Sequence, residues 1–288
     1  MDIEGISGAA TIALASSLVF FLIARSWQLI SRSIGNGSNF SGSTMREAAQ
    51  RFRDEFDRLN SNQSTYLGAG VVFVLLFVAA YVLQARALFI GYPVWQLHIL
   101  LGALLTGTML AFCRLLSTAL ACHRIRLRRD ANIAVGHQLQ RLADGMGRSY
   151  HDVETDAGII DHLIVGHNGA YAVSVFALPA RKNGQVSLQG HALLFAPGGK
   201  TRSLVAANAR IASLEREFRR LLDHRVRVRS VVAVPGWDIT AQGNEEHLLV
   251  NERNLPMLSG WRDQADYLLH EDVDALHDLL TARGSKQK

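Results

Sequence analysis

The sequence contains only two cysteines, Cys113 and Cys122, and no Cys-x-x-Cys pair. Nine residues of helix would separate them by about 13.5 Å, whereas a disulfide needs Cα atoms less than about 7 Å apart. A disulfide-stapled fold and a zinc–thiolate site are therefore excluded. The sequence also lacks a Walker A loop, a Gly-x-Gly-x-x-Gly and a Gly-x-Ser-x-Gly. It thus carries no signature of a nucleotide-binding loop or of a nucleophilic serine.

Charged residues are missing from three long stretches, residues 6–24, 63–85 and 88–113. A helix needs about 20 apolar residues to cross the hydrocarbon core of a bilayer, and three such runs close together are unusual in a soluble core. We therefore expect a membrane domain over residues 1–129 with three transmembrane helices. Their predicted bounds are about 6–24, 65–84 and 93–113.

The arginines indicate the orientation of these spans, because cytoplasmic loops are enriched in Lys and Arg. Six arginines lie between the first two spans, only Arg86 lies between the second and third, and five follow the third. The sequence therefore predicts a multi-pass protein of a bacterial inner (plasma) membrane, with its N-terminus outside and its C-terminal part in the cytoplasm. The first span could instead be a signal peptide, but its acidic MDIE start favours a retained anchor.

The net charge of +5 arises mainly from the membrane domain. Residues 130–288 carry a net charge of −1, and the preceding 129 residues carry +6. Basic residues beside spans face anionic lipid headgroups, so the charge is a topology signal. It does not indicate a basic DNA-binding domain.

A Gly/Ser/Asn linker over residues 33–43 precedes a predicted amphipathic helix at about 44–60. Met45, Phe52 and Phe56 keep helical spacing on its apolar face. This helix could lie on the membrane surface or pack on the cytoplasmic domain. Its small apolar face favours packing.

Periodicity changes after Asp130, and residues 130–288 read as a separate cytoplasmic α/β domain. We expect a helix at 131–146 and strands at 149–155, 159–166 and 170–178, followed by a hairpin around 186–195. A helix at 204–222, a strand ending at Pro235, and a C-terminal strand with two or three helices follow. This order predicts an α/β sandwich.

The stretch GIIDHLIVGHNGAYAVSVF, residues 158–176, reads as two strands joined by a tight His-Asn-Gly turn. It resembles the central hairpin of the nuclease-related domain (NERD) family, a branch of the restriction-endonuclease-like superfamily. The resemblance covers residues 130–260, in which SVVAVP and LVNERNLPML are similar to later elements of that family. It implies a restriction-endonuclease-like α/β/α domain with a mixed sheet.

The resemblance also implies a site in which Asp and Glu on adjacent strands hold Mg²⁺ and a Lys orients the attacking water. Asp161 keeps the family's aspartate, but Ser174 and Phe176 stand at the Glu and Lys positions, and His137 replaces a helix Glu. No other carboxylate lies between Asp161 and Gly184. One oxygen ligand binds Mg²⁺ poorly, so we predict an inactive nuclease fold in which Asp161 and His137 are vestigial.

Other ligand sets have simpler interpretations. His137, Asp161 and His162 could form a transition-metal site, but successive strand residues point to opposite faces. An Asp161 bonded to backbone or to His137 is therefore favoured. Asp152, Glu154 and Asp156 are interpreted as a solvated strand edge, and His270 and His277 as an exposed helix face. We expect no metal and no cofactor, apart from Mg²⁺ in an active nuclease.

The domain separates its charges along the chain. Residues 201–229 carry a net charge of +5, and residues 236–280 carry −8. The basic segment could bind a phosphate backbone or anionic lipid, or pair with the acidic segment of the same or a neighbouring copy. The arginines predicted to bind nucleic acid or lipid are Arg210, Arg216, Arg219, Arg220, Arg227 and Arg229.

Three functions are consistent with these features. The favoured one is a degenerate nuclease-related domain, displayed at the inner membrane as a binding or assembly module of a membrane complex or homo-oligomer. The alternative is a membrane-tethered, Mg²⁺-dependent DNA nuclease with a rearranged site using Asp161 and His137. The third is a membrane-surface sensor whose arginine-rich helix binds lipid headgroups.

Overall fold

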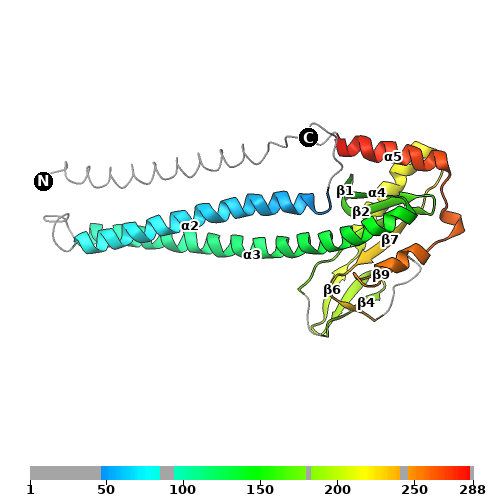
Figure 1. Cartoon of the computed structure of the whole chain (residues 1–288). Coiled ribbons are helices and arrows are strands. Elements are labelled where there is room, and N and C mark those ends of the chain that lie inside the picture. The colour runs from blue at the N-terminus through cyan, green and yellow to red at the C-terminus, as the bar shows by residue number, and fades with distance from the viewer. Residues whose placement is uncertain (1–46, 85–93, 180–182, 241–245, 286–288) are drawn as a thin grey trace. The chain divides into compact units, whose positions relative to one another are not determined.

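The structure is a computed structural model that describes residues 47–84, 94–179, 183–240 and 246–285 (Figure 1). These residues form two compact units. One contains residues 56–84 and 94–123, and the other contains residues 47–55 and 124–285. The sequence placed the boundary at residue 130, whereas the segment from 47 to 55 also belongs to the α/β unit.

Two long helices, α2 (Gln50–Gln84) and α3 (Val94–Met146), supply the helical unit. The predicted amphipathic helix and the second span form one continuous helix, α2, within which the Ser64 and Thr65 hydroxyls donate to carbonyls one turn earlier. The third span and the predicted helix at 131–146 likewise form one helix, α3.

Close packing joins the two helices at small residues, as the spacing of Gly107 and Ala111 in the third span allows. A Cβ added at Gly107 would lie 3.0 Å from the Phe73 ring, and one added at Gly70 would lie 3.8 Å from Ala111. Away from this contact, Leu75, Leu105, Met109 and other large apolar side chains are exposed.

Among the described residues, one helical stretch, Gly102–Ala143, is long and apolar enough to cross a membrane. The sequence predicted three such helices. The first predicted span lies outside the described residues, and the second falls in α2, whose side chains are described only as far as Leu76. The described structure therefore supplies weak evidence of membrane association.

The α/β unit is built on a five-stranded mixed sheet in the order β1-β2-β3-β7-β9. Its first three strands are antiparallel, and β7 and β9 are added in parallel to β3. The predicted hairpin is confirmed, with a two-residue loop between paired Gly166 and Gly169. The strands are β1 (Arg148–Thr155), β2 (Gly158–Gly166), β3 (Gly169–Val175), β7 (Val228–Ala233) and β9 (His247–Val250).

Helices cover both faces of this sheet. Val135 and Leu139 of α3 pack with Ile164 and Tyr171 on one face. On the other face, α4 (Val205–Leu222) and α5 (His270–Ser285) pack on Leu163 and its neighbours. The α/β class and the mixed sheet are thus confirmed.

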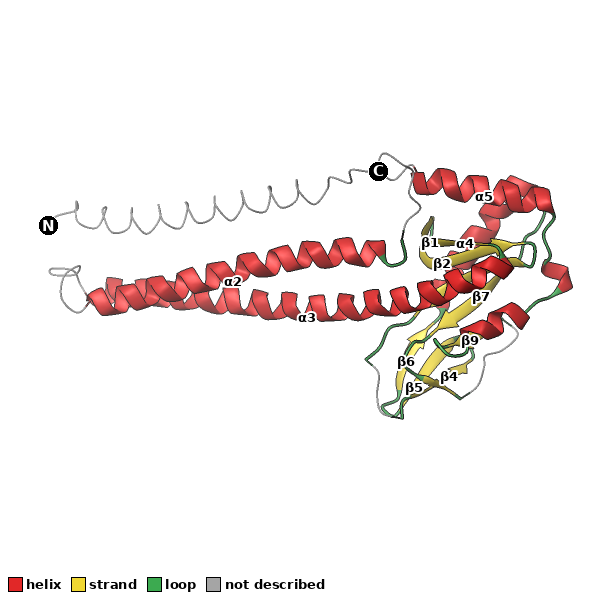
Figure 2. Ribbon diagram, viewed as in Figure 1, coloured by secondary structure: helices red, strands yellow, loops and turns green. Residues whose placement is uncertain are grey.

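A second sheet, in the order β6-β5-β4-β8, extends the unit (Figure 2). Phe195 and Trp237 pack edge to face between this sheet and β7 and β9, with ring centroids 5.0 Å apart. Two short 3-10 helices, Leu255–Gly260 and Gln264–Asp266, precede α5. The strands are β4 (Gln185–Gln189), β5 (Ala192–Ala196), β6 (Lys200–Ser203) and β8 (Asp238–Ile239).

Candidate functional site

Asp161 is buried in β2, and both of its carboxylate oxygens are bonded within the α/β unit. The Arg51 guanidinium donates to Oδ1 at 3.1 Å, and the backbone N–H of Val175 donates to Oδ2 at 2.9 Å. The paired residues of β2 and β3 run only from His162 and Val173 to the turn. The Asp161 side chain thus satisfies a β3 backbone donor beyond the end of that pairing.

The regular alternation of β2 is broken at this point. Ile160 and Leu163 pack in the same core cluster, although residues three apart on a regular strand face opposite ways. Across from them, Asp152 of β1 has a φ of 51°, in the left-handed region. The expectation that Asp161 and His162 face opposite sides of the sheet assumed regular alternation, and β2 does not alternate regularly at these residues.

Asp152 is buried, which corrects its interpretation as part of a solvated edge. Its side chain is 2% exposed, and it accepts from the backbone N–H of Arg51 at 3.2 Å. The Arg51 Nε also lies 3.7 Å from Asp152 Oδ1. One arginine at the start of α2 therefore contacts two buried carboxylates on adjacent strands, a convergence that the sequence alone did not reveal.

Burial dominates the protonation of this region. It raises the pKa of Asp161, and the Val175 N–H and the charge of Arg51 oppose that shift. Burial likewise lowers the pKa of His162 to about 3, with the neighbouring His151 and Arg51 adding to the effect. The two imidazoles meet Nδ1 to Nδ1 at 2.8 Å, so one donates and the other accepts. This contact requires at least one of the two rings to be neutral.

The other residues predicted for a nuclease site do not complete one. Ser174 is buried in β3 opposite Val232, and Phe176 packs in the core beside the second sheet. His137 is exposed on α3, whereas Asp161 is buried and bonded to Arg51. Arg51 also contacts a second buried carboxylate, Asp152.

The predicted arginine surface divides into buried and exposed members. Arg229 is buried, donates to Asp266 at 2.5 Å and to Asp263 at 3.3 Å, and stacks on the Trp261 ring at 4.5 Å. It therefore belongs to an intramolecular network with the acidic segment and cannot bind an external anion. Arg210 is half-buried and donates to the Ile159 carbonyl at 2.6 Å. The exposed members are Arg216, Arg219, Arg220 and Arg227.

His277 also differs from its prediction as part of an exposed helix face. It is 8% exposed, and its Nδ1 lies 2.7 Å from the Tyr150 hydroxyl on β1. His270, at the first residue of α5, is exposed. The seven-residue spacing places both on one side of the helix, where the His270 ring stacks on His167 of the β2–β3 turn at 4.2 Å and His277 meets β1.

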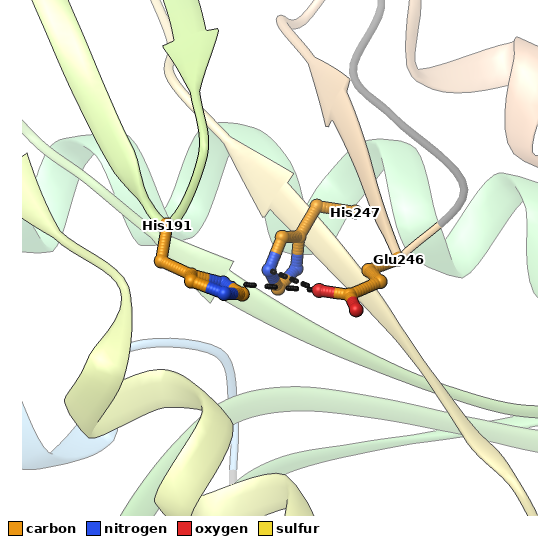
Figure 3. A group of neighbouring side chains, drawn as sticks. All are labelled: His191, Glu246 and His247. Atoms are coloured by element: carbon orange, nitrogen blue, oxygen red, sulfur yellow. Dashed lines mark ion pairs between the residues drawn. The ribbon is translucent and has the colours of Figure 1, made fainter.

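A second cluster was not predicted at all. His191, in the turn between β4 and β5, lies beside Glu246 and His247 at the start of β9 (Figure 3). One ligand atom from each residue lies within 4.8 Å of the other two. The sequence offered no signal for it, because 54 residues lie between the first histidine and the pair and no short motif joins them.

Comparisons with protein-family models, with curated proteins and with solved structures give no significant match to this chain.

Proposed function

We propose that this protein is a membrane-anchored binding or assembly module whose α/β unit keeps a nuclease-related fold without its metal-dependent chemistry. In this proposal three spans anchor the chain in a bacterial inner membrane and the α/β unit lies in the cytoplasm. The mixed sheet, covered by helices on both faces, is consistent with a restriction-endonuclease-like core.

The state of Asp161 is the observation that carries the proposal. A Mg²⁺ site needs carboxylate oxygens free to bind a hard cation. Here Asp161 bonds Arg51 and Val175, and the guanidinium of Arg51 lies against Asp152 as well. A fixed positive charge at two carboxylates opposes the entry of a second cation.

No base or water-orienting lysine is provided at the corresponding strand positions. Ser174 and Phe176 lie there, and a phenyl ring cannot accept a proton from water. Asp161 instead has a structural role, since it satisfies the Val175 backbone donor and Arg51. The buried pair fixes residues 47–55 to the α/β unit, which suits a module that must hold a defined shape.

The exposed arginines Arg216, Arg219, Arg220 and Arg227 favour an acidic partner surface, such as anionic lipid, nucleic acid or an acidic protein. Arg229 is excluded from this surface because its fork is already occupied by Asp266 and Asp263. An acidic face on a second copy or on another membrane protein would complement the remaining four side chains.

The nuclease alternative is tested with the full-length protein in detergent, incubated with supercoiled plasmid and Mg²⁺. We expect no nicking by the wild type, and none by Arg51→Ala, in which the two carboxylates lose their arginine. Mg²⁺-dependent nicking that disappears in Asp161→Ala would overturn the proposal. A binding module further predicts that partners recovered with the wild type are lost from the variant with glutamate at the four exposed arginine positions.

A further inference from the structure

We propose that His191, Glu246 and His247 form a binding site for a divalent transition-metal ion of the Zn²⁺ class, which joins the two sheets of the α/β unit. This site is separate from the Asp161 region and does not depend on the function proposed above. His191 lies in the β4–β5 turn of the second sheet, His247 is the first residue of β9 in the first sheet, and Glu246 immediately precedes it.

The ligand atoms converge from these two places (Figure 3). Nδ1 of His191 lies 3.7 Å from Glu246 Oε2, and Nε2 of His247 lies 4.0 Å from the same oxygen. Zn²⁺ takes His nitrogen and carboxylate oxygen at about 2.0–2.2 Å, which places tetrahedral ligands about 3.4 Å apart. Contraction by about 0.3 and about 0.6 Å would bring these two separations to that value, and ligand atoms of all three residues already lie within 4.8 Å of one another.

His191 and Glu246 are the two ligands that must move toward the ion, and their positions allow that movement. His191 and Glu246 are exposed, and Gly190, at a φ of 57°, adjoins His191 in a turn. His247 is 2% exposed and held in β9, so it supplies a fixed point. The site is therefore partly preorganised, with one rigid ligand and two adjustable ones.

The buried histidine is oriented as metal-bound histidines are. Its Nδ1 lies 2.8 Å from the Ser230 hydroxyl on β7, which leaves Nε2 directed at the cluster. A partner on the second ring nitrogen fixes the tautomer and ring plane of a ligating imidazole.

Asn208 of α4 adds an unsatisfied oxygen beside the site. Its Nδ2 lies 3.5 Å from His247 Nε2, and its Oδ1 is one of two buried side-chain polar atoms in the described residues that have no hydrogen-bond partner. A half-turn of the amide exchanges these atoms and brings an oxygen toward the metal position. The set would then offer two nitrogens and two oxygens, a composition that suits Zn²⁺.

Two imidazoles and one carboxylate favour Zn²⁺ and its neighbours over Mg²⁺ and Ca²⁺, which take all-oxygen shells. The expected consequence is a cross-link between the β4–β5 turn and β9. A metal ion that binds only the folded protein raises the free energy of unfolding, by an amount set by the metal concentration relative to the dissociation constant.

The test is titration of the untagged full-length protein in detergent with Zn²⁺ alone, by calorimetry, with Co²⁺ absorption as a second readout of coordination. We expect one ion per chain and a rise in melting temperature. His191→Asn and Glu246→Gln, both exposed, should weaken binding at least tenfold, and Ser230→Ala by about 10–100-fold.

His224→Asn is the matched control, because His224 is also exposed and lies beside an acid, Asp272, at 3.5 Å. It should bind Zn²⁺ as the wild type does. Unchanged affinity in both His191→Asn and Glu246→Gln would overturn the proposal, and so would equal loss in the control. Circular dichroism verifies that each variant is folded, and a Glu246→Asp variant that partly restores binding would support direct ligation.

Discussion

Arg51 and Asp161, 110 residues apart in the sequence, form an ion pair with Nη2 and Oδ1 separated by 3.1 Å. The pair connects the start of α2 to the middle of β2. It also determines what the aspartate can do, because a carboxylate already bonded to a guanidinium and a backbone N–H is poorly available to Mg²⁺.

Replacement of Arg51 by alanine should destabilise the α/β unit by about 2 kcal/mol. Two buried carboxylates, Asp152 and Asp161, would lose their cation, and breaking a buried pair costs about 3–5 kcal/mol. We expect only about 2 kcal/mol here because the Arg51 side chain is 30% exposed, so that water partly screens its charge. Urea unfolding followed by tryptophan fluorescence measures the change. Arg53→Ala, which removes an exposed pair with Glu47, should cost less than about 0.5 kcal/mol.

The same variant should be least harmful at acidic pH. Arg51 opposes the burial that raises the pKa of Asp161, so its removal raises that pKa further. A carboxyl with a raised native pKa is stabilising while protonated and loses that contribution as pH rises through its native pKa. The difference in unfolding free energy between wild type and Arg51→Ala should therefore shrink as pH falls toward 4. A difference that stays constant would contradict the assigned contact.

His162 should make the wild-type α/β unit less stable in acid. Its native pKa is about 3, against 6.5 for an ordinary histidine. Below pH 6.5, therefore, His162 binds a proton in the unfolded chain but stays neutral in the native protein. Stability is then lost as pH falls, by about 2 kcal/mol between pH 6.5 and 5. His162→Asn should reduce this slope, and His151, His247 and His277, whose pKa values burial also lowers, should supply the remainder. His137→Asn, at an exposed position, should keep the wild-type slope.

Arg229→Ala should destabilise the unit by about 3–5 kcal/mol, because Asp266, 3% exposed, would remain buried without its cation. Arg229→Lys should not restore stability, since an ammonium cannot reproduce both the stacking on Trp261 and the fork to two carboxylates. Arg227→Ala, at an exposed neighbour, should change stability by less than about 0.5 kcal/mol. Equal effects at the two positions in urea unfolding would refute the division into buried and exposed arginines.

Local patterns predicted the elements well, because they depend on residues close in sequence. The Asn168-Gly169 turn and the apolar runs around it indicated the β2–β3 hairpin, and helical spacing indicated α4. Side-chain partners were predicted poorly. The left-handed backbone at Asp152 buries a side chain that alternation places at an edge, and neither the Arg51 pair nor the His191 cluster has a local signature.

The helix pair supplies a last prediction, based on two glycines of α3. A Cβ at Gly107 would meet the Phe73 ring of α2 at 3.0 Å, whereas a Cβ at Gly102 would meet nothing within 4 Å. Leucine has a higher helix propensity than glycine by several tenths of a kcal/mol, so Gly102→Leu should be neutral or slightly stabilising. Gly107→Leu should separate the helices and lower the melting temperature in detergent. Cysteine cross-linking between Phe73→Cys and Gly107→Cys should proceed efficiently, and equal melting temperatures for the two leucine variants would show that α2 and α3 do not pack at this position.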